Sequence, residues 1–119
     1  MYPLIMDLSL KNIHLLETFE LNSTIKSDKP FEISELFNGE RRRLLKIKLT
    51  NGETLKKHQA DEPITILCLA GKGVFKAGEN LEEEIELEAG TLLTLEAKIM
   101  HEIIAKPELS LLLTKFKQS

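Results

Sequence analysis

The strongest structural signals of this chain lie in residues 45–73, LKIKLTNGETLKKHQADEPITILCLAGKG. Apolar and charged residues alternate strictly from Leu45 to Leu49, which is the period-two pattern of a strand with one buried face. Asn51-Gly52 follows, and this dipeptide is one of the strongest turn signals. Ile64 to Ala70 is then a continuous apolar run ended by glycines, which favours a buried strand over a helix.

The sequence after this stretch predicts more short strands. Glycines and short polar segments separate the apolar or alternating residues at regular intervals. Short strands with such regular punctuation are typical of a β-sandwich or small barrel, so we expect an all-β fold. The segments expected to be strands are 74–77, 83–88, 91–95, 101–105 and 109–116.

Bulk composition limits the possible classes of function. The chain has 119 residues, 42% of them hydrophobic, which suits one domain with one core. Its formal net charge of -3 and the lack of a long basic patch argue against binding to nucleic acid. The Arg41–Arg43 cluster is expected to be a solvated strand edge or a dimer contact. The single cysteine, Cys68, excludes an internal disulfide.

The first forty residues are less regular than the rest. Their apolar residues, from Leu8 to Phe19, follow neither the helix nor the strand period, and Lys29-Pro30 marks a break. We interpret residues 1–39 as an N-terminal arm, containing edge strands or a short helix, that packs on the barrel or on a partner. Residues 40–119 are expected to form the barrel. No apolar run is long enough for a membrane helix and no secretory signal is evident, so we expect a cytoplasmic protein without a membrane association.

Two histidines occupy similar settings. His58 lies six residues after Gly52 and thirteen before Gly71, and His101 lies eleven residues after Gly90. This layout resembles the two motifs of the cupin superfamily, the RmlC-like barrels, over roughly residues 40–116. The resemblance implies a double-stranded β-helix, or cupin jelly-roll barrel. It also implies that His58 and His101 face one pocket, and that the protein is a homodimer.

The sequence departs from the metal-binding form of the motifs. Ala60 and Ile64 stand where such a cupin has a second histidine and a glutamate, and Glu96 and Lys98 stand where proline and glycine are usual. A working metal site generally has three protein ligands and an open position. A third ligand from Glu53, Asp61 or Glu62 is the minor alternative, and solvated charge is the simpler interpretation of these residues. The sequence leaves the cofactor unknown; if a metal binds, we expect a weakly bound divalent ion (Zn, Ni or Fe) on His58 and His101.

These features predict a ligand pocket with two polar anchors in an apolar lining. On a strand, Ile64, Ile66 and Cys68 share one face, so we expect them to line the pocket beside His58 and His101. Cys68 is expected to line the pocket and not to act as a nucleophile. A simpler interpretation also stands, in which the two histidines are inward-facing residues bonded to backbone or water. His14 is expected to be incidental.

The main functional hypothesis is a non-catalytic barrel that binds a small molecule or has a structural role. The alternative is an enzyme. A metal-dependent oxygenase or isomerase would need an atypical ligand set, and a metal-free epimerase would need a histidine base and a tyrosine acid. Tyr2 is the only tyrosine of the chain.

Overall fold

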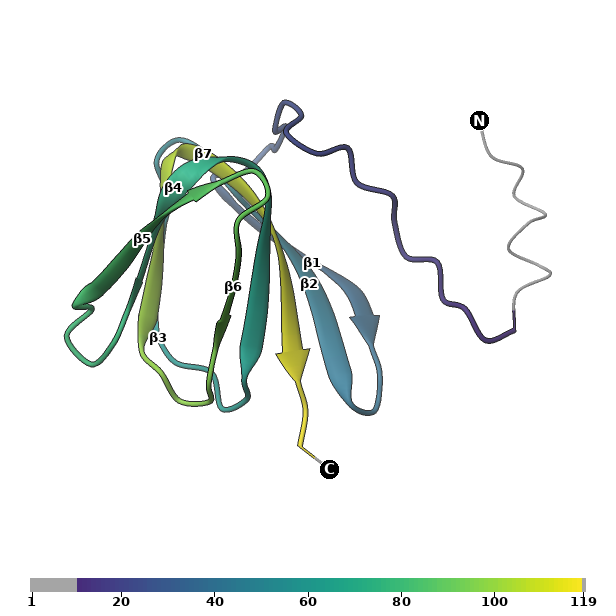
Figure 1. Cartoon of the computed structure of the whole chain (residues 1–119). Helices are drawn as coiled ribbons and strands as arrows, with labels where there is room; N and C mark the ends of the chain where they lie inside the picture. Colours follow the sequence, from purple (N-terminus) through teal and green to yellow (C-terminus); the bar gives the residue numbers. More distant parts are fainter. Residues whose placement is uncertain (1–10, 119) are drawn as a thin grey trace.

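The computed structural model describes residues 11–118, and within them every regular element is a strand (Figure 1). None of these residues belongs to a helix long and apolar enough to cross a bilayer. Tyr2, Leu8 and the rest of residues 1–10 lie outside the described residues, as does residue 119. The strands are β1 (Phe31–Asn38), β2 (Arg42–Leu49), β3 (Thr54–His58), β4 (Ile64–Ala77), β5 (Glu83–Glu88), β6 (Leu92–Leu95) and β7 (His101–Phe116).

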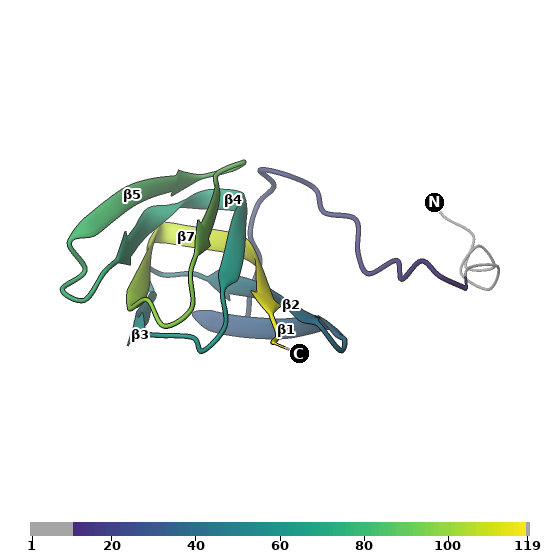
Figure 2. The same ribbon diagram turned by 60° about the horizontal axis from the view of Figure 1, so that its bottom comes forward.

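Two long strands, β4 and β7, organise the sheet. They pair antiparallel along their whole lengths, from Ile64 opposite Lys115 to Ala77 opposite His101. One half of β7 also pairs with β2 and the other half with β3, whereas β4 pairs with β6 and then with β5. The sheet therefore folds over on itself, and the strands enclose a common interior when viewed from the end (Figure 2). This all-β barrel is the expected architecture.

The sequence predicted each long strand as two short ones. Residues 64–70 and 74–77 form the single strand β4, and residues 101–105 and 109–116 form the single strand β7. The reason is that the glycines after Ala70 bend β4 without ending it. The register shifts between Cys68 and Ala70 and again between Gly71 and Gly73, so β-bulges take up the bend and pairing resumes beyond it.

The turn at Asn51-Gly52 was predicted correctly. Both residues have positive φ angles, 58° and 70°, and the Glu53 amide donates a hydrogen bond to the Thr50 carbonyl at 3.1 Å. Such a turn needs residues that tolerate the left-handed region, which asparagine and glycine do. It sends the chain from β2 into β3, which pairs with β7 and not with β2.

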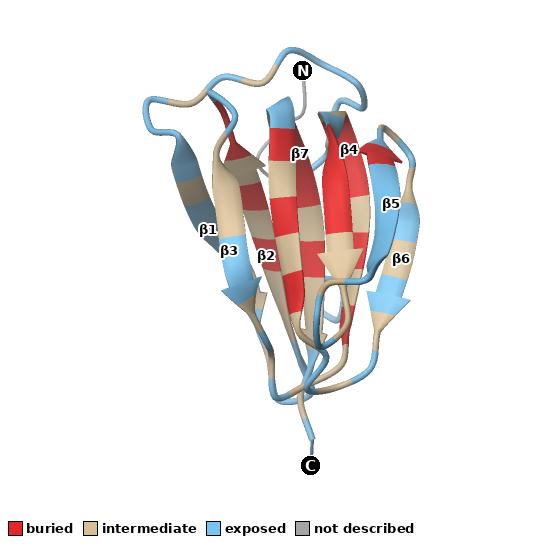
Figure 3. Cartoon of the chain, turned by 90° about the vertical axis from the view of Figure 1, so that its left-hand side faces the viewer, coloured by how far each residue is buried: buried red, intermediate tan, exposed pale blue. Residues whose placement is uncertain are grey.

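The core lies between the inner faces of the strands. On β2, Leu45, Ile47 and Leu49 are buried and the lysines between them are partly exposed, as the alternation predicted. Figure 3 shows the buried residues concentrated on β2, β7 and β4, with more exposed strands at the flanks. Apart from these three, the core contains Ile64, Ile66, Cys68, Phe75, Leu87, Ile103, Ala105, Leu109, Leu111 and Leu113.

Residues 11–30 of the N-terminal arm form no helix or strand, and they run beside the β1–β2 hairpin (Figure 1). It contacts the outer face of the sheet through an ion pair between Glu17 and Lys46 at 2.8 Å. Its side chains Ile13, Leu15 and Leu21 are exposed. The last part of the arm forms β1. Among the described strands β1 pairs with β2 alone, so it is an edge strand.

The bend at Gly71 leads to a prediction about stability, for which Gly52 is the matched control. Gly71 has a φ of +88°, and a Cβ there would overlap the backbone carbonyl oxygen of Glu108. Gly52 has a φ of +70° but nothing within 4 Å of its Cβ position. We expect Gly71→Ala to lower the free energy of unfolding by about 3 kcal/mol or more. Gly52→Ala should lower it by only about 1–2 kcal/mol, the cost of a left-handed residue. Urea denaturation measures both, and equal losses would contradict the close approach of β4 to β7.

Candidate functional site

The structure brings His58 and His101 together at one end of the barrel. His58 ends β3 and His101 begins β7, and the two are cross-strand partners. Their ring centroids are 4.3 Å apart with an interplanar angle of 58°. Directly opposed residues of an antiparallel pair project from the same face, so the two imidazoles form one polar group at the barrel mouth.

Backbone contacts determine which nitrogen of each ring carries the proton. Nδ1 of His58 lies 2.8 Å from the carbonyl oxygen of Lys56, and Nδ1 of His101 lies 3.0 Å from that of Ile99. A carbonyl oxygen only accepts hydrogen bonds, so each Nδ1 is the protonated donor. In the neutral rings, both Nε2 atoms are then acceptors that can bind a ligand or a metal ion.

His101 is buried and neutral. Only 2% of its surface is exposed, and the Phe75 ring packs edge-on against it with centroids 5.7 Å apart. Burial lowers the pKa of His101, and the positive charges of His58 and Lys115 lower it further, while the hydrogen bond to the Ile99 carbonyl opposes the shift. Nε2 of His101 is therefore a hydrogen-bond acceptor near neutral pH.

The strand register places two more residues in line with the histidines. His101 is opposite Ala77 on β4, and Ala77 is opposite Glu83 on β5. A row of inward-facing positions therefore crosses the mouth from His58 to Glu83. Sequence reasoning missed Ala77 and Glu83, because only the register of β4 and β5 brings them to this row.

A small cavity lies beside this row. Its volume is about 150 Å³, and its apolar lining consists of Phe75, Ala77, Ile85, Leu93 and Leu95, with Glu83, Glu84 and Thr94 at its polar side. The cavity is next to the histidine pair because Ala77 is the cross-strand partner of His101 and Phe75 contacts its ring. An apolar cavity with a few polar groups is typical of a small-molecule site.

The other predicted pocket residues lie deeper. Ile64, Ile66 and Cys68 are buried in the core and do not line the mouth cavity. Ile64 and Ile66 are instead the cross-strand partners of Leu95 and Leu93, which do line it. They support the cavity wall from the neighbouring strand.

Cys68 has the character of a core residue. Its thiol lies 3.5 Å from the Ala70 carbonyl oxygen, to which it donates a weak hydrogen bond. Burial raises the pKa of this thiol, so it stays protonated and is not a reactive thiolate.

Many solved structures share this arrangement of strands. A cupin superfamily protein from Desulfitobacterium hafniense matches with a TM-score of 0.71 at 15% identity, covering 88% of this chain and 100% of that chain. An RmlC-like cupin protein from Desulfovibrio desulfuricans matches with a TM-score of 0.69 at 19% identity, covering 85% of this chain and 95% of that chain. This chain has the cupin fold. A DMSP lyase from Ruegeria pomeroyi has it too, with a TM-score of 0.68 at 14% identity, and this chain spans 48% of that protein. No family model and no curated protein matches the sequence.

The residues of this barrel do not fit a three-ligand metal centre. Ala60 packs against the core, and its carbonyl oxygen accepts a hydrogen bond from the Lys98 amide at 2.7 Å, which joins the two loops that flank the histidines. Among residues 11–118, no group of three or more His, Cys, Asp or Glu side chains is placed to hold a metal ion. Asp61 and Glu62 border a different cavity, with Lys98 and Lys117. The site therefore offers a metal two imidazole nitrogens.

Two other sequence candidates lie away from this site or outside the description. His14 packs against Phe37 at the end of β1, with ring centroids 5.3 Å apart. Tyr2, the acid of the epimerase hypothesis, falls outside the described residues.

The lowered pKa of His101 predicts a loss of stability in acid. The unfolded chain takes up a proton near the ordinary histidine pKa of 6.5, whereas folded His101 resists protonation until a lower pH. This contribution is complete above pH 6.5 and is lost as the pH falls from there to the folded-state pKa. We expect His101→Gln to flatten the dependence of the unfolding free energy on pH between about pH 7.5 and about pH 5. Urea denaturation across this range measures it. His14→Gln is the control, and the same flattening in both variants would contradict the assignment to His101.

Proposed function

We propose that this protein is a non-catalytic cupin that binds a small, largely apolar molecule at the barrel mouth, with His58 and His101 as polar anchors. The observation that supports this most directly is the position of the mouth cavity. Ala77 lines it and is the cross-strand partner of His101. A ligand seated over Ala77 would lie about 5 Å from His101, the ordinary spacing of cross-strand neighbours, with His58 one strand further along the row.

The size and chemistry of the cavity suggest the kind of ligand. A volume of about 150 Å³ corresponds to roughly five water molecules at ~30 Å³ each, so the ligand would be about the size of one six-membered ring. The lining favours an apolar body. The Nε2 acceptor of His101 favours a ligand with one hydroxyl or amine donor, because a donor that reaches it gains a hydrogen bond.

A catalytic role would depend on how the titratable groups near the cavity are placed. Proton transfer on carbon needs an acid and a base on either side of the substrate. Glu83 and Glu84 border the cavity, whereas the two histidines lie next to each other beyond Ala77 and Phe75 and do not line it, so no histidine faces a carboxylate across the cavity. The DMSP lyase shows that the fold can carry an enzyme, so the argument against catalysis depends on this site and not on the fold.

The ligand proposal is tested with phenol and toluene, which differ by a single hydroxyl donor. We expect phenol to bind with a Kd of about 1 mM and toluene more weakly, because only phenol can donate to Nε2. Nuclear magnetic resonance titration of ¹⁵N-labelled protein would show shifts at Ala77 and His101. Ala77→Leu should fill the cavity, so we expect neither phenol nor toluene to shift the His101 resonance in this variant.

Ala89→Leu is the matched control, because Ala89 lies in the turn between β5 and β6 and does not line the cavity. Binding that survives Ala77→Leu would show that the mouth cavity is not the site.

Calorimetry with Zn²⁺ addresses the enzyme alternative. Two imidazoles predict a Kd weaker than about 10 μM, lost in His58→Ala, whereas stoichiometric binding below about 1 μM would favour a metal-dependent cupin.

We also propose that the protein is a homodimer through β1. Phe31 and Ile33 stand opposite the core residues Leu49 and Ile47, yet they are 37% and 49% exposed. These two apolar side chains continue the core beyond the last strand, and no strand among residues 11–118 pairs with the outer edge of β1. A second copy would cover both the side chains and the edge.

Ile33→Lys tests the dimer. We expect the parent protein to sediment as a dimer at about 50 μM and the variant as a folded monomer. The apparent stability of the parent should rise with protein concentration and that of the variant should not, because only a dimer is stabilised by mass action. Leu92→Lys is the control, because Leu92 is exposed on β6, away from this edge. A monomeric parent protein would contradict the proposal.

A further inference from the structure

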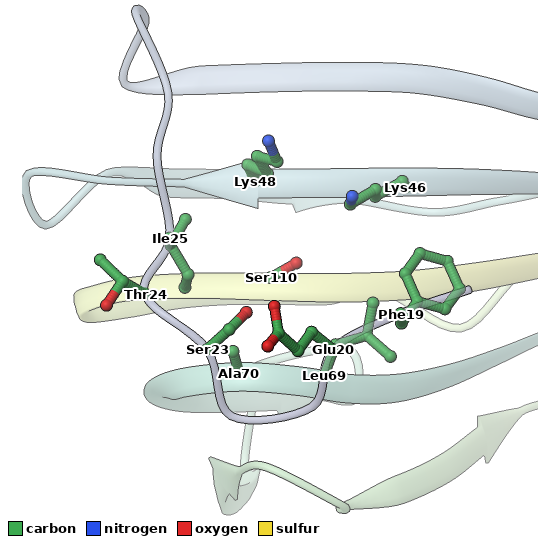
Figure 4. Close-up of a pocket in the computed structure, with 10 residues that line it drawn as sticks. All are labelled: Phe19, Glu20, Ser23, Thr24, Ile25, Lys46, Lys48, Leu69, Ala70 and Ser110. Atoms are coloured by element: carbon green, nitrogen blue, oxygen red, sulfur yellow. The ribbon is translucent and has the colours of Figure 1, made fainter. Parts of the chain in front are cut away.

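A second cavity lies on the outer face of the sheet, away from the histidine pair. It has a volume of about 180 Å³ and lies between the N-terminal arm and strands β2, β4 and β7 (Figure 4). Its floor includes a row of outward-facing residues across these three strands, with Ser110 opposite Lys48 on one side and Ala70 on the other. The small Ala70 and Ser110 side chains leave a notch beside the long lysine.

The arm makes the cavity because it is held on both sides of it. The Asn22 amide donates a hydrogen bond to the Leu69 carbonyl at 2.7 Å, at the first bulge of β4. Further along the arm, the Lys48 ammonium donates to the Lys26 carbonyl at 3.1 Å. Asn22 has a φ of 57°, so the chain turns there and the following residues rise over the sheet. The walls of the cavity are therefore fixed by contacts with the barrel.

The groups in the cavity have both signs of charge. Figure 4 shows the carboxylate of Glu20, the hydroxyl of Ser23 and the hydroxyl of Ser110 directed toward one region, with Lys46 and Lys48 beside it. Lys46 pairs with Glu17 at 2.8 Å and Lys48 with Glu32 at 4.0 Å. Glu20 takes part in none of the ion pairs found among residues 11–118. Ser110 is only 7% exposed, so its hydroxyl is available mainly to a group inside the cavity.

We infer that this cavity binds a small zwitterion of the amino-acid type. Lys46 and Lys48 are two residues apart on one strand, so their side chains project from the same face. Each ammonium group has three donors, so a ligand carboxylate can bind there in addition to Glu17 and the Lys26 carbonyl. Glu20 is placed to receive the ammonium group, and the serine hydroxyls complete the hydrogen bonds. A simple anion would meet the repulsion of Glu20, and a simple amine would meet that of the lysines, so a molecule with both charges matches the site best.

The cavity limits the size and affinity of the ligand. Its volume equals that of roughly six water molecules at ~30 Å³ each, which suits an amino acid with a short side chain. The lysines are partly exposed, so their attraction for a carboxylate is screened by salt. We expect weak binding, with a Kd near 1 mM at low salt.

The test uses three probes of nearly the same size: L-alanine, propionate, which lacks the ammonium group, and ethylamine, which lacks the carboxylate. We expect L-alanine to shift the ¹⁵N resonances of Ser23, Lys48 and Ser110, and to bind about tenfold more tightly than either of the others. Equal binding of L-alanine and propionate, or no shifts with L-alanine up to roughly 50 mM, would overturn the inference.

Glu20→Gln should change the binding of L-alanine and propionate in opposite directions, whereas loss of structure would weaken both. The exposed Glu20 becomes neutral, so we expect L-alanine to bind about tenfold more weakly and propionate to bind more tightly than in the parent protein. A parallel loss of both probes, or no change in either, would overturn the role of Glu20. His58→Ala should leave L-alanine binding unchanged, because that residue belongs to the barrel mouth. Loss of L-alanine binding in His58→Ala would assign the probe to the mouth site and overturn the inference.

Discussion

The continuous pairing of β4 with β7 is the constraint on which the rest of the structure depends. Each of these strands is shared by both halves of the barrel, so neither half could keep its shape without the other. The bend that allows this is possible only because Gly71 and Gly73 let the backbone of β4 approach that of β7 more closely than any Cβ would permit. The bulges are therefore part of the architecture and not irregularities in it.

The same register positions both candidate sites, on opposite faces. On the inner face it places Ala77 between His101 and Glu83, which opens the mouth cavity beside the imidazole pair. On the outer face it places Ser110 between Lys48 and Ala70, which forms the floor of the second cavity. The two sites share the strands but no side chain, because successive residues of a strand point to opposite faces.

The sequence predicted what depends on local pattern. The alternation from Leu45 to Leu49 and the turn at Asn51-Gly52 specify their structures within a few residues, and both predictions were right. The cupin resemblance, which depended on the glycine and histidine spacing, is confirmed at the level of the fold. What the sequence could not predict depends on long-range register. The continuity of β4 through its glycines and the alignment of Ala77 with His101 both follow from pairing between residues more than twenty positions apart.

The apolar character of the barrel mouth and the neutrality of His101 have one cause. Ile64 and Ala60 pack against the core at positions where a metal-binding cupin would have a carboxylate and an imidazole. With no carboxylate at these two positions, a divalent cation held by the two imidazoles would have little compensating charge among its ligands, and burying an uncompensated charge is costly. The same low polarity disfavours the protonated form of His101 and lowers its pKa. Surroundings that disfavour the charged form of His101 also disfavour charged ligands. A neutral molecule with one hydrogen-bond donor therefore suits this site better than a metal ion.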